Sequence, residues 1–480
     1  MGKGAPIKSI IFTFKYVNVP FSSNLHFDIS ERKILLRIMD LFSVFLVLTL
    51  VGYSFHFGYL TLTQSQWIWS ITLGLYLMIF GTIFELYDLQ RAASFQTTLK
   101  NILLTVSVTA LFYLLTPYFT PVLPANRIQI LVFFSAMVLA LLGWRYLYII
   151  LFSTPRFNKR VLVVGNAFDI QLIAHNLHVA DPNYKVIGFV NTDKPLQSNE
   201  NVKLKVVELV DIQKAVRRYA VSEIVVSSAG EGINFQLYTQ LIRLLEKGFT
   251  IREYTQVYEE ITHKVPVEHM ELDFYKYFPF SRSNKNRLYI FYNRFFNVFF
   301  AFVCSLVTLV LIPFIVVGNR LANKGPLLYK QDRVGLNGRT FQIIKFRTMV
   351  ENAEKNGAEW SQKGDRRITG FGKILRNARL DELPQCINIL RGDMNLIGPR
   401  PERPEFVRAL SKKIPFYETR HVIKPGLTGW AQVRGRYAQS TEDALEKLQY
   451  DLYYIKHRNL FLDLNILLKT CSTMIYYRGQ

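Results

Sequence analysis

Residues 295–317 read FFNVFFAFVCSLVTLVLIPFIVV, an apolar run of 23 residues with no charged side chain. A helix needs about 20 predominantly apolar residues to cross a bilayer, so this run predicts a membrane helix. Both of its flanks are basic. The preceding flank contains Lys276, Arg282, Lys285, Arg287 and Arg294, and the following flank contains Arg320, Lys324, Lys330 and Arg333.

The two basic flanks decide how this helix is placed. Lys and Arg are enriched on the cytoplasmic side of membrane helices, whereas a spanning helix leaves one flank outside. We therefore expect a re-entrant helix with interfacial flanks over 278–320, which enters and leaves on the cytoplasmic face. Pro313 supplies a place to break, because proline lacks a backbone N–H and clashes with the preceding turn. An ordinary fifth span stays open as the alternative, because the charge rule is a bias.

Four earlier runs also lack Lys, Arg, Asp and Glu: residues 41–60, 67–84, 101–120 and 128–144. Arg32, Lys33 and Arg37 precede the first run and hold its start in the cytoplasm. No cleavable signal is evident, so we expect the first helix to be an uncleaved anchor. The sequence thus predicts a cytoplasmic segment over 1–30 and a bundle of four transmembrane helices over 31–150, with both ends in the cytoplasm.

The composition excludes several classes of protein. Half of the 480 residues are hydrophobic and 20% are charged, yet 58 Lys and Arg against 36 Asp and Glu give a net charge of +22. A basic disordered tail or nucleic-acid arm is poor in apolar residues, so that class is excluded. Segregation of the apolar residues into long runs argues against an ordinary soluble enzyme. The three cysteines, Cys304, Cys386 and Cys471, are too scattered for a disulfide framework or a CxxC metal site.

The middle of the chain has a different pattern. Residues 160–167 read RVLVVGNA, a strand that ends in a single glycine, and short β runs then alternate with amphipathic segments. This alternation predicts a doubly wound, parallel α/β domain over about 160–270. A dinucleotide site needs the glycines of GxGxxG, but Gly165 stands alone, and Phe168 and Ile170 crowd the turn. We interpret 151–277 as a Rossmann-like, CoA-binding-like module with a structural or regulatory role.

The basic excess is concentrated in the last third. From residue 320 to 480, 29 Lys and Arg face 16 Asp and Glu, a balance of +13. Such a surface can bind either anionic lipid headgroups or the phosphates of a substrate. The basic residues recur among glycines and prolines in short loops, as in KFRTM (345–349) and GPRPERP (398–404), which favours phosphate binding.

Residues 381–392, DELPQCINILRG, predict a short helix. Pro384 fits its first turn, and Gly392 fits its C-terminal cap. Asp381 and Glu382 then lie at or just before the N-terminus, where helix capping is the simplest role for an isolated acidic pair. Nearby basic residues and loops, among them Arg376 and Arg379, favour a functional role instead.

Two carboxylates, a ring of guanidinium groups and no Cys/His cluster suit Mg²⁺ shared with substrate phosphates, and do not suit zinc. Arginine matches phosphate oxygens bidentately, and a carboxylate can act as a covalent nucleophile on phosphorus. The residues therefore predict phosphoryl chemistry at a membrane surface.

The stretch from about 284 to 480 resembles the bacterial sugar transferases, the polyprenyl-phosphate hexose-1-phosphate transferases. The strings that carry the resemblance are GPLLYKQDRVGLNGRTFQIIKFRTM (325–349), RRITGFGKILRNARLDELPQCINILRGDMNLIGPRPERP (366–404), PGLTGWAQVRGR (425–436) and YDLYYIKHRNLFLDLNIL (450–467). The membrane helices and the Rossmann-like insert resemble the long, exopolysaccharide-type members. The resemblance implies a membrane protein that combines α and α/β parts, with a mainly helical catalytic domain over 321–480. It also implies a place in the bacterial cytoplasmic membrane, with the Rossmann-like and catalytic domains on the cytoplasmic face.

The resemblance also implies a reaction. Such enzymes transfer hexose 1-phosphate from a nucleoside diphosphate sugar to undecaprenyl phosphate, the first membrane step of exopolysaccharide, capsule or O-antigen synthesis. UDP-glucose or UDP-galactose is the expected donor, and UMP is released. Asp381 matches the aspartate that forms a covalent phosphosugar adduct, and Glu382 matches its partner, expected to bind Mg²⁺ or Mn²⁺. The basic positions expected around the diphosphate and nucleotide are Lys345, Arg347, Arg376, Arg379 and Arg400.

Membrane lipids are the other expected partners. A homodimer is compatible with the sequence, and no nucleic acid is expected. This chain departs from some members at the membrane helix, where Ile312-Pro313 replaces Ser-Pro and Thr308 lies four residues before Ile312.

A non-catalytic membrane scaffold that binds anionic lipid and polymer-synthesis partners stays open as an alternative. A nucleotide-sugar oxidoreductase is a weaker one, because 160–270 supplies neither an intact glycine loop nor a Tyr-xxx-Lys pair.

Overall fold

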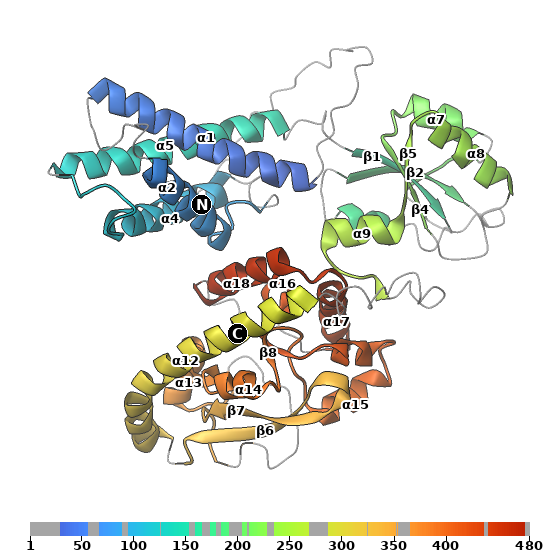
Figure 1. The fold of residues 1–480 in the computed structure, drawn as a ribbon. Helices are drawn as coiled ribbons and strands as arrows, with labels where there is room; N and C mark the ends of the chain where they lie inside the picture. Colours follow the sequence, from blue (N-terminus) through green and yellow to red (C-terminus); the bar gives the residue numbers. More distant parts are fainter. Residues whose placement is uncertain are drawn as a thin grey trace, which may run out of the picture.

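The computed structural model describes residues 29–55, 67–88, 95–124, 126–152, 159–165, 173–178, 184–191, 204–208, 211–227, 235–267, 287–323, 325–351, 353, 365–435 and 440–475. Figure 1 shows three parts along the chain: a group of long helices (blue to teal), an α/β domain (green) and a C-terminal domain (yellow to red). The predicted segment 1–30 lies almost wholly outside the described residues, as do Phe168, Ile170, Lys276, Arg282 and Lys285.

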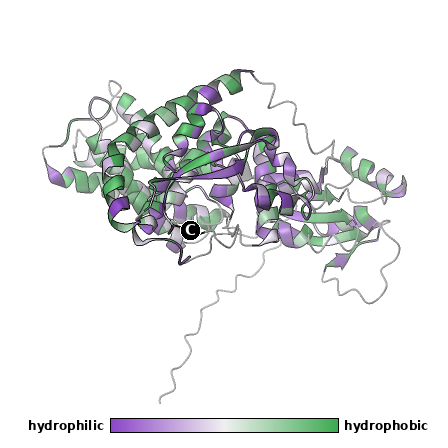
Figure 2. Ribbon diagram, turned by 90° about the horizontal axis from the view of Figure 1, so that it is seen from below, coloured by the Kyte–Doolittle hydropathy of each residue, from purple (hydrophilic) through white to green (hydrophobic). Residues whose placement is uncertain are grey.

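The first part consists of α1 (Ile29–Phe55), α2 (Trp67–Ile83), α4 (Phe95–Leu115) and α5 (Arg127–Phe152). Their shared core includes Val44, Leu77, Ile102 and Met137, while the outward-facing residues are also largely apolar. Within the described residues, α1, α4, α5 and α12 are long and apolar enough to cross a membrane, and α2 is a shorter apolar helix. The predominance of hydrophobic residues along the long helices is visible in Figure 2, and it is the pattern of an integral membrane protein.

One ion pair is buried inside this helix group. Arg145 Nη2 of α5 donates to Asp40 Oδ2 of α1 at 2.6 Å, and the two side chains are 1% and 0% exposed. The guanidinium of Arg145 also lies over the ring of Tyr87, which follows α2. A polar pair in an apolar core is satisfied only when both partners meet, so it fixes the register of α1 against α5.

The second part confirms the predicted parallel α/β domain. Its five-stranded sheet has the order β3-β2-β1-β4-β5, and every paired strand is parallel. The strands are β1 (Lys159–Gly165), β2 (Tyr184–Asn191), β3 (Lys205–Val206), β4 (Glu223–Val226) and β5 (Thr250–Glu253). Alternate residues of β1 point to opposite faces. One face packs against α7 (Ile212–Arg218) and α8 (Phe235–Glu246), and the other against α9 (Tyr254–Thr262) and the helical residues 173–178.

The single glycine at the end of β1 has a packing reason. A Cβ added to Gly165 would lie 2.8 Å from Cβ of Ser227, at the end of the neighbouring strand β4. The glycine therefore allows two strand ends to approach closely, whatever the domain binds.

The third part is built on two small β units and several helices. A hairpin pairs β6 (Leu328–Val334) with β7 (Thr340–Phe346), and β8 (Asn395–Ile397) runs parallel to β9 (Gly426–Thr428). Around them lie α13 (Gly370–Asn377), α14 (Gln385–Arg391), α15 (Pro404–Ser411), α16 (Trp430–Arg434), α17 (Thr441–His457) and α18 (Leu460–Ile475), with 3₁₀ turns η5 (Leu336–Gly338), η6 (Leu380–Glu382) and η7 (Tyr417–Val422). The domain is mainly helical, as predicted.

The helix α12 (Arg287–Ala322) covers one side of this domain. Secondary structure continues through Pro313, while the last turns of the helix run in a different direction from the rest (Figure 1). Near its start, Asn297 donates to Asn395 Oδ1 at 3.1 Å and accepts from the amide of Leu396 at 2.8 Å. Towards its end, Ile315 packs in a cluster with Phe346. Contacts with one domain therefore occur near both ends of α12.

The α/β domain is joined to the C-terminal domain through α9 and the residues that follow it. Lys456 Nζ of α17 donates to both carboxylate oxygens of Glu259, at 2.7 and 2.9 Å. The amide of Val265 donates to the carbonyl of Gln449 at 3.1 Å. Val265 and Val267 are fully buried among C-terminal hydrophobic residues, so this segment completes the core of the next domain.

Candidate active site

Asp381 and Glu382 lie in η6, a single turn that comes just before α14. The turn starts from Arg379, whose φ of 56° is in the left-handed region, an unfavourable conformation for a residue with a side chain. Pro384 is the N-cap residue of α14, one position before the predicted first turn, and Gly392 caps the end of the helix with a φ of 88°, as predicted from the sequence. The turn thus places the carboxylate of Glu382 against Lys345 of the β6–β7 hairpin.

Glu382 is held by two basic residues from different elements. Its Oε1 accepts hydrogen bonds from Arg400 Nη2 at 2.7 Å and from Lys345 Nζ of β7 at 3.2 Å. Burial alone would raise the pKa of Glu382, but the positive charges of Arg400 and Lys345 outweigh it and hold the pKa well below its ordinary value. Glu382 is therefore a permanent anion near neutral pH.

Asp381 behaves in the opposite way. Its side chain is buried, and burial together with the negative charge of Glu382 raises its pKa, against the attraction of Lys345, Arg376 and Arg400. Two adjacent carboxyl groups with pKa values pushed apart are typical of catalytic pairs. The electrostatics of the turn thus distinguish a constantly charged Glu382 from a less stabilised, more basic Asp381.

The structure brings most, but not all, of the predicted basic residues to this turn. Lys345 and Arg400 contact Glu382 directly, and the charges of Arg376 and Arg379 act on the pair. The Nε of Arg376 donates to Thr348 Oγ1 at 2.9 Å. Arg347 is directed elsewhere, because its Nε donates to the carbonyl of Pro326 at 3.1 Å.

The loop that carries Arg400 is fixed by close backbone packing. A Cβ on Gly426 would lie 2.1 Å from the amide nitrogen of Gly398, so only glycine allows these two loops to touch. The contact joins the predicted strings at 398–404 and 425–436. Their parallel pairing through β8 and β9 then holds Arg400 next to Glu382.

A buried ion pair behind Arg400 was not identified from the sequence. Arg420 Nη2 donates to the carbonyl of Arg400 at 3.1 Å and to Asp451 Oδ2 at 2.7 Å, and its Nη1 donates to the hydroxyl of Tyr417 at 2.7 Å. Arg420 and Asp451 are 31 residues apart, and no spacing rule pairs them. The guanidinium thus connects α17 to the backbone of the residue that holds Glu382.

Asn388 is a second positioning residue that the sequence did not reveal. Its side chain is fully buried; Oδ1 accepts from the amide of Ile344 at 3.1 Å, and Nδ2 donates to the carbonyl of Gln342 at 2.7 Å. These bonds fasten α14 to the edge of β7 and so fix the distance between Lys345 and Glu382. The one signal that the sequence offers for this role is a polar asparagine within the short helix predicted over 381–392.

The donor set fits a divalent cation that is shared with substrate. Lys345 and Arg400 both donate to Oε1 of Glu382, and neither donates to Oε2. Glu382 stays ionised, and Mg²⁺ commonly binds one or two carboxylates plus substrate phosphates. Among the described residues, no group of three or more His, Cys, Asp or Glu is placed to hold a metal ion.

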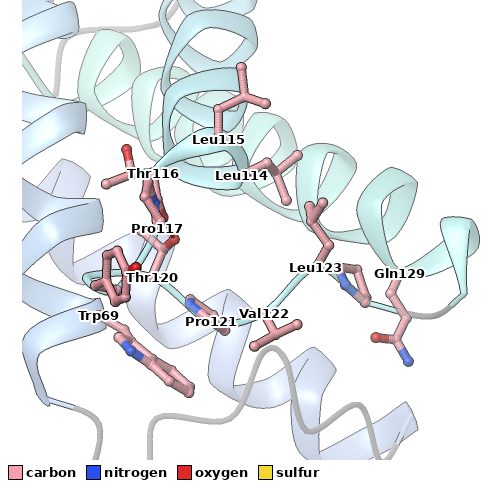
Figure 3. A pocket seen from close by; sticks show the side chains of 12 residues that line it. Trp69, Leu114, Leu115, Thr116, Pro117, Thr120, Pro121, Val122, Leu123 and Gln129 are labelled. Atoms are coloured by element: carbon pink, nitrogen blue, oxygen red, sulfur yellow. Dashed lines mark hydrogen bonds between the residues drawn. The ribbon is translucent and has the colours of Figure 1, made fainter.

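A pocket at a different place does not suit such a substrate. It lies where α4 leads into α5, between Trp69, Leu114, Pro117 and Val122 (Figure 3). None of its lining residues is charged. A diphosphate would leave its charges unpaired there, so the chemistry is expected at the Asp381–Glu382 turn instead.

Comparison with known proteins relates the C-terminal part of the chain to one family. Residues 288–477 match the family model described as bacterial sugar transferase. A UDP-N-acetylgalactosamine-undecaprenyl-phosphate N-acetylgalactosaminephosphotransferase of Aeromonas hydrophila is 48% identical over 156 residues, which cover 32% of this chain and 37% of that protein. A UDP-glucose:undecaprenyl-phosphate glucose-1-phosphate transferase of Xanthomonas campestris is 41% identical over 34% of each chain.

The extent of these matches differs among the relatives. The uncharacterized sugar transferase EpsL of Bacillus subtilis is 38% identical over 172 residues, which cover 36% of this chain and 81% of EpsL. By contrast, the chain spans only about a third of the length of the Aeromonas and Xanthomonas relatives.

Proposed function

Since the chain belongs to the bacterial sugar transferase family, we propose that it transfers a sugar 1-phosphate from a nucleoside diphosphate sugar to undecaprenyl phosphate. The matched relatives from Aeromonas and Xanthomonas carry the names of enzymes for this type of reaction. The observation that carries the proposal is the adjacent pair of buried carboxyl groups, one held as an anion by Lys345 and Arg400, with further arginines around it.

The first step is an attack by a carboxylate oxygen of Asp381 on the phosphorus that bears the sugar. A bond forms between that oxygen and phosphorus, the bond from phosphorus to the bridging oxygen breaks, and the nucleoside monophosphate leaves. Burial and the negative charge of Glu382 make Asp381 more basic than an ordinary aspartate, which favours nucleophilic attack. Arg376 and Arg400 are close enough to stabilise the charge on the departing phosphate.

The second step releases the sugar phosphate from the protein. An oxygen of undecaprenyl phosphate attacks the same phosphorus, the bond to Asp381 breaks, and a sugar-bearing undecaprenyl diphosphate forms. Glu382 would hold Mg²⁺ through Oε2, while Lys345 and Arg400 keep its Oε1 in place. When bound, the cation would neutralise charge on the diphosphate of the donor.

The packing of α12 supports a re-entrant placement at the cytoplasmic face. At about 1.5 Å per residue, 36 residues extend roughly 54 Å, far more than the approximately 30 Å hydrocarbon core. A straight crossing would put the ends on opposite sides, yet Asn297 donates to Asn395 and Ile315 packs with Phe346, both in the C-terminal domain. Phe302, Leu309 and Phe314 on the opposite face are 57–73% exposed, which suits contact with lipid tails.

Cysteine labelling tests this placement. In a variant without Cys304, Cys386 and Cys471, the substitution Arg320→Cys is expected to resist a membrane-impermeant maleimide applied to intact cells, and to react after the cells are opened. Tyr118→Cys, in the connection expected outside, serves as the reactive control. Labelling of residue 320 in intact cells would overturn the re-entrant placement.

A donor screen tests the reaction. Purified protein, undecaprenyl phosphate and Mg²⁺ are incubated with UDP-glucose, UDP-galactose or UDP-N-acetylgalactosamine, and both UMP release and sugar in the lipid fraction are measured. We expect one donor to be strongly preferred, and activity to disappear in excess chelator and return with Mg²⁺ or Mn²⁺. UMP release without transfer to lipid would contradict the proposed acceptor, and full activity in chelator would contradict the metal role.

The pH dependence of the first step follows from the raised pKa of Asp381. Attack needs the ionised carboxylate, so the rate should fall on the acid side at a higher pH than the pKa of about 3.9 of an ordinary aspartate. In Glu382→Gln the neighbouring negative charge is gone, so this acid limb should move to lower pH although the rate falls. Single-turnover UMP release at a series of pH values measures the acid limb. Glu405→Gln, at an exposed position of α15, is the control. An acid limb that does not move in Glu382→Gln would contradict the effect of Glu382 on the pKa of Asp381.

A further inference from the structure

Three basic residues from three separate elements act through their charges on His263, the residue that follows α9. They are Lys33 near the start of α1, Arg434 at the end of α16 and Lys469 of α18. The guanidinium of Arg434 lies 4.9 Å from the ring centroid of Trp430, and Nζ of Lys469 lies 6.0 Å from the same centroid. Trp430 is almost fully buried and donates from Nε1 to the carbonyl of His263 at 3.1 Å.

The charges of these residues act on a common point. Burial, together with the positive charges of Lys33, Arg434 and Lys469, lowers the pKa of His263 well below its ordinary value, so this histidine is neutral. Asp88 is the acidic group whose charge acts on Lys33. In the part of the chain that the structure describes, Lys33 and Arg434 form no ion pair, and Nε of Arg434 is buried without an acceptor.

The proximity of Lys33 and Arg434 is unfavourable for the protein alone. Like charges brought together repel one another, and a buried N–H of a guanidinium without an acceptor bears the cost of its lost hydration. An anion between Lys33 and Arg434 would relieve the repulsion between them and give Nε of Arg434 an acceptor. Arginine is well suited to a phosphate, because it offers several donors in a planar fork.

The position of the grouping indicates where the anion comes from. Lys33 belongs to the first turns of the apolar helix α1, and α18 packs beside α2 of the same helix group. The exposed face of α18 carries Phe461, 84% exposed, and Leu464, 54% exposed. Apolar residues on either side of a basic cluster are typical of the level at which lipid headgroups lie.

We propose that Lys33, Arg434 and Lys469 form a binding site for the phosphate group of an anionic glycerophospholipid, which joins the membrane helices to the C-terminal domain. The site is separate from the proposed reaction, because the dominant charges on Asp381 and Glu382 come from Lys345, Arg376, Arg379 and Arg400. A bound lipid would fix α1 and α18 at the same depth in the bilayer.

Native mass spectrometry of the full chain, exchanged from detergent into mixtures of phosphatidylglycerol and phosphatidylcholine, tests this site. We expect phosphatidylglycerol to remain on the wild-type chain at a collision energy that removes phosphatidylcholine. The double variant Lys33→Gln/Arg434→Gln should reduce the retained fraction roughly tenfold or more. Lys214→Gln/Arg243→Gln, which removes the same charge from α7 and α8, should retain lipid as the wild type does.

A second pair of measurements separates the possible outcomes. The charge-conserving variant Lys33→Arg/Arg434→Lys is expected to keep most of the lipid, which distinguishes loss of binding from loss of folding. Inorganic phosphate at millimolar concentration should not displace the lipid. Equal retention by the two glutamine double variants, equal retention of both lipids, or full displacement by phosphate would each overturn the proposal. The readout is lipid retention, so a failure of sugar transfer leaves this test unaffected.

Discussion

Replacement of Asp381 by Asn is expected to abolish transfer, with a loss of at least about 10³-fold, because the amide has the shape of the carboxylate but is not a nucleophile. With a donor and no lipid acceptor, the wild-type chain should gain the mass of a sugar phosphate, and the variant should not. Intact-protein mass spectrometry measures the adduct, and label transferred to lipid measures the complete reaction.

The control for this substitution lies just beyond the C-terminal cap of α14, whereas Asp381 precedes that helix. Asp393 accepts a hydrogen bond from Asn388 Nδ2 at 3.2 Å, but it has no role in the proposed displacement. Asp393→Asn should therefore keep the adduct and most of the transfer. An adduct of normal yield in Asp381→Asn would show that another group attacks phosphorus.

The second large effect is expected at Arg420. Arg420→Met removes the partner of Asp451 and leaves a buried carboxylate, which should destabilise the C-terminal domain by about 3–5 kcal/mol. It also removes the donor to the carbonyl of Arg400, so transfer should fall. Thermal unfolding in detergent and the lipid-transfer assay measure the two effects.

A double substitution separates stability from positioning. Burial raises the pKa of Asp451 to about 6 although Arg420 lies against it, so the ion pair does not fully offset its desolvation. Arg420→Met/Asp451→Leu should therefore recover much of the stability, because no unpaired charge remains. Transfer should stay low, because the carbonyl of Arg400 still lacks its donor. Recovery of stability and transfer together would show that Arg420 acts only on folding.

Local signals were enough to predict much of the fold. Alternating apolar strands gave the parallel α/β domain, and Pro384 and Gly392 gave the limits of α14. The same helix also shows where such reasoning fails. Its apolar residues Ile387 and Leu390 are 37% and 38% exposed, whereas the polar Gln385 and Asn388 are buried. In a protein that faces lipid, an apolar residue need not point to the core.

Only the part of the candidate site that is continuous in the sequence was predictable. Asp381, Glu382 and Arg400 belong to one run of sequence, and the fold joins them to Lys345 from a hairpin 37 residues earlier. Arg420, Asp451 and Asn388 contribute through the backbone of other residues, and tertiary packing alone decides such contacts. Arg347 lies only two residues after Lys345 in sequence, yet its Nε donates to the carbonyl of Pro326. Residues two apart in a strand share a face, but Arg347 lies just beyond the end of β7 at Phe346, so the alternation of the strand no longer sets its direction.

The buried segment around Val265 and Val267 has a consequence for how the protein can be divided. Both valines come before the membrane helix α12, yet they fill the core of the domain that comes after it. A fragment cut at the start of α12 would lack these two side chains, and the C-terminal hydrophobic residues that they cover would be exposed. The C-terminal domain therefore cannot be exchanged as an independent unit for that of a relative, because the preceding domain supplies part of its core.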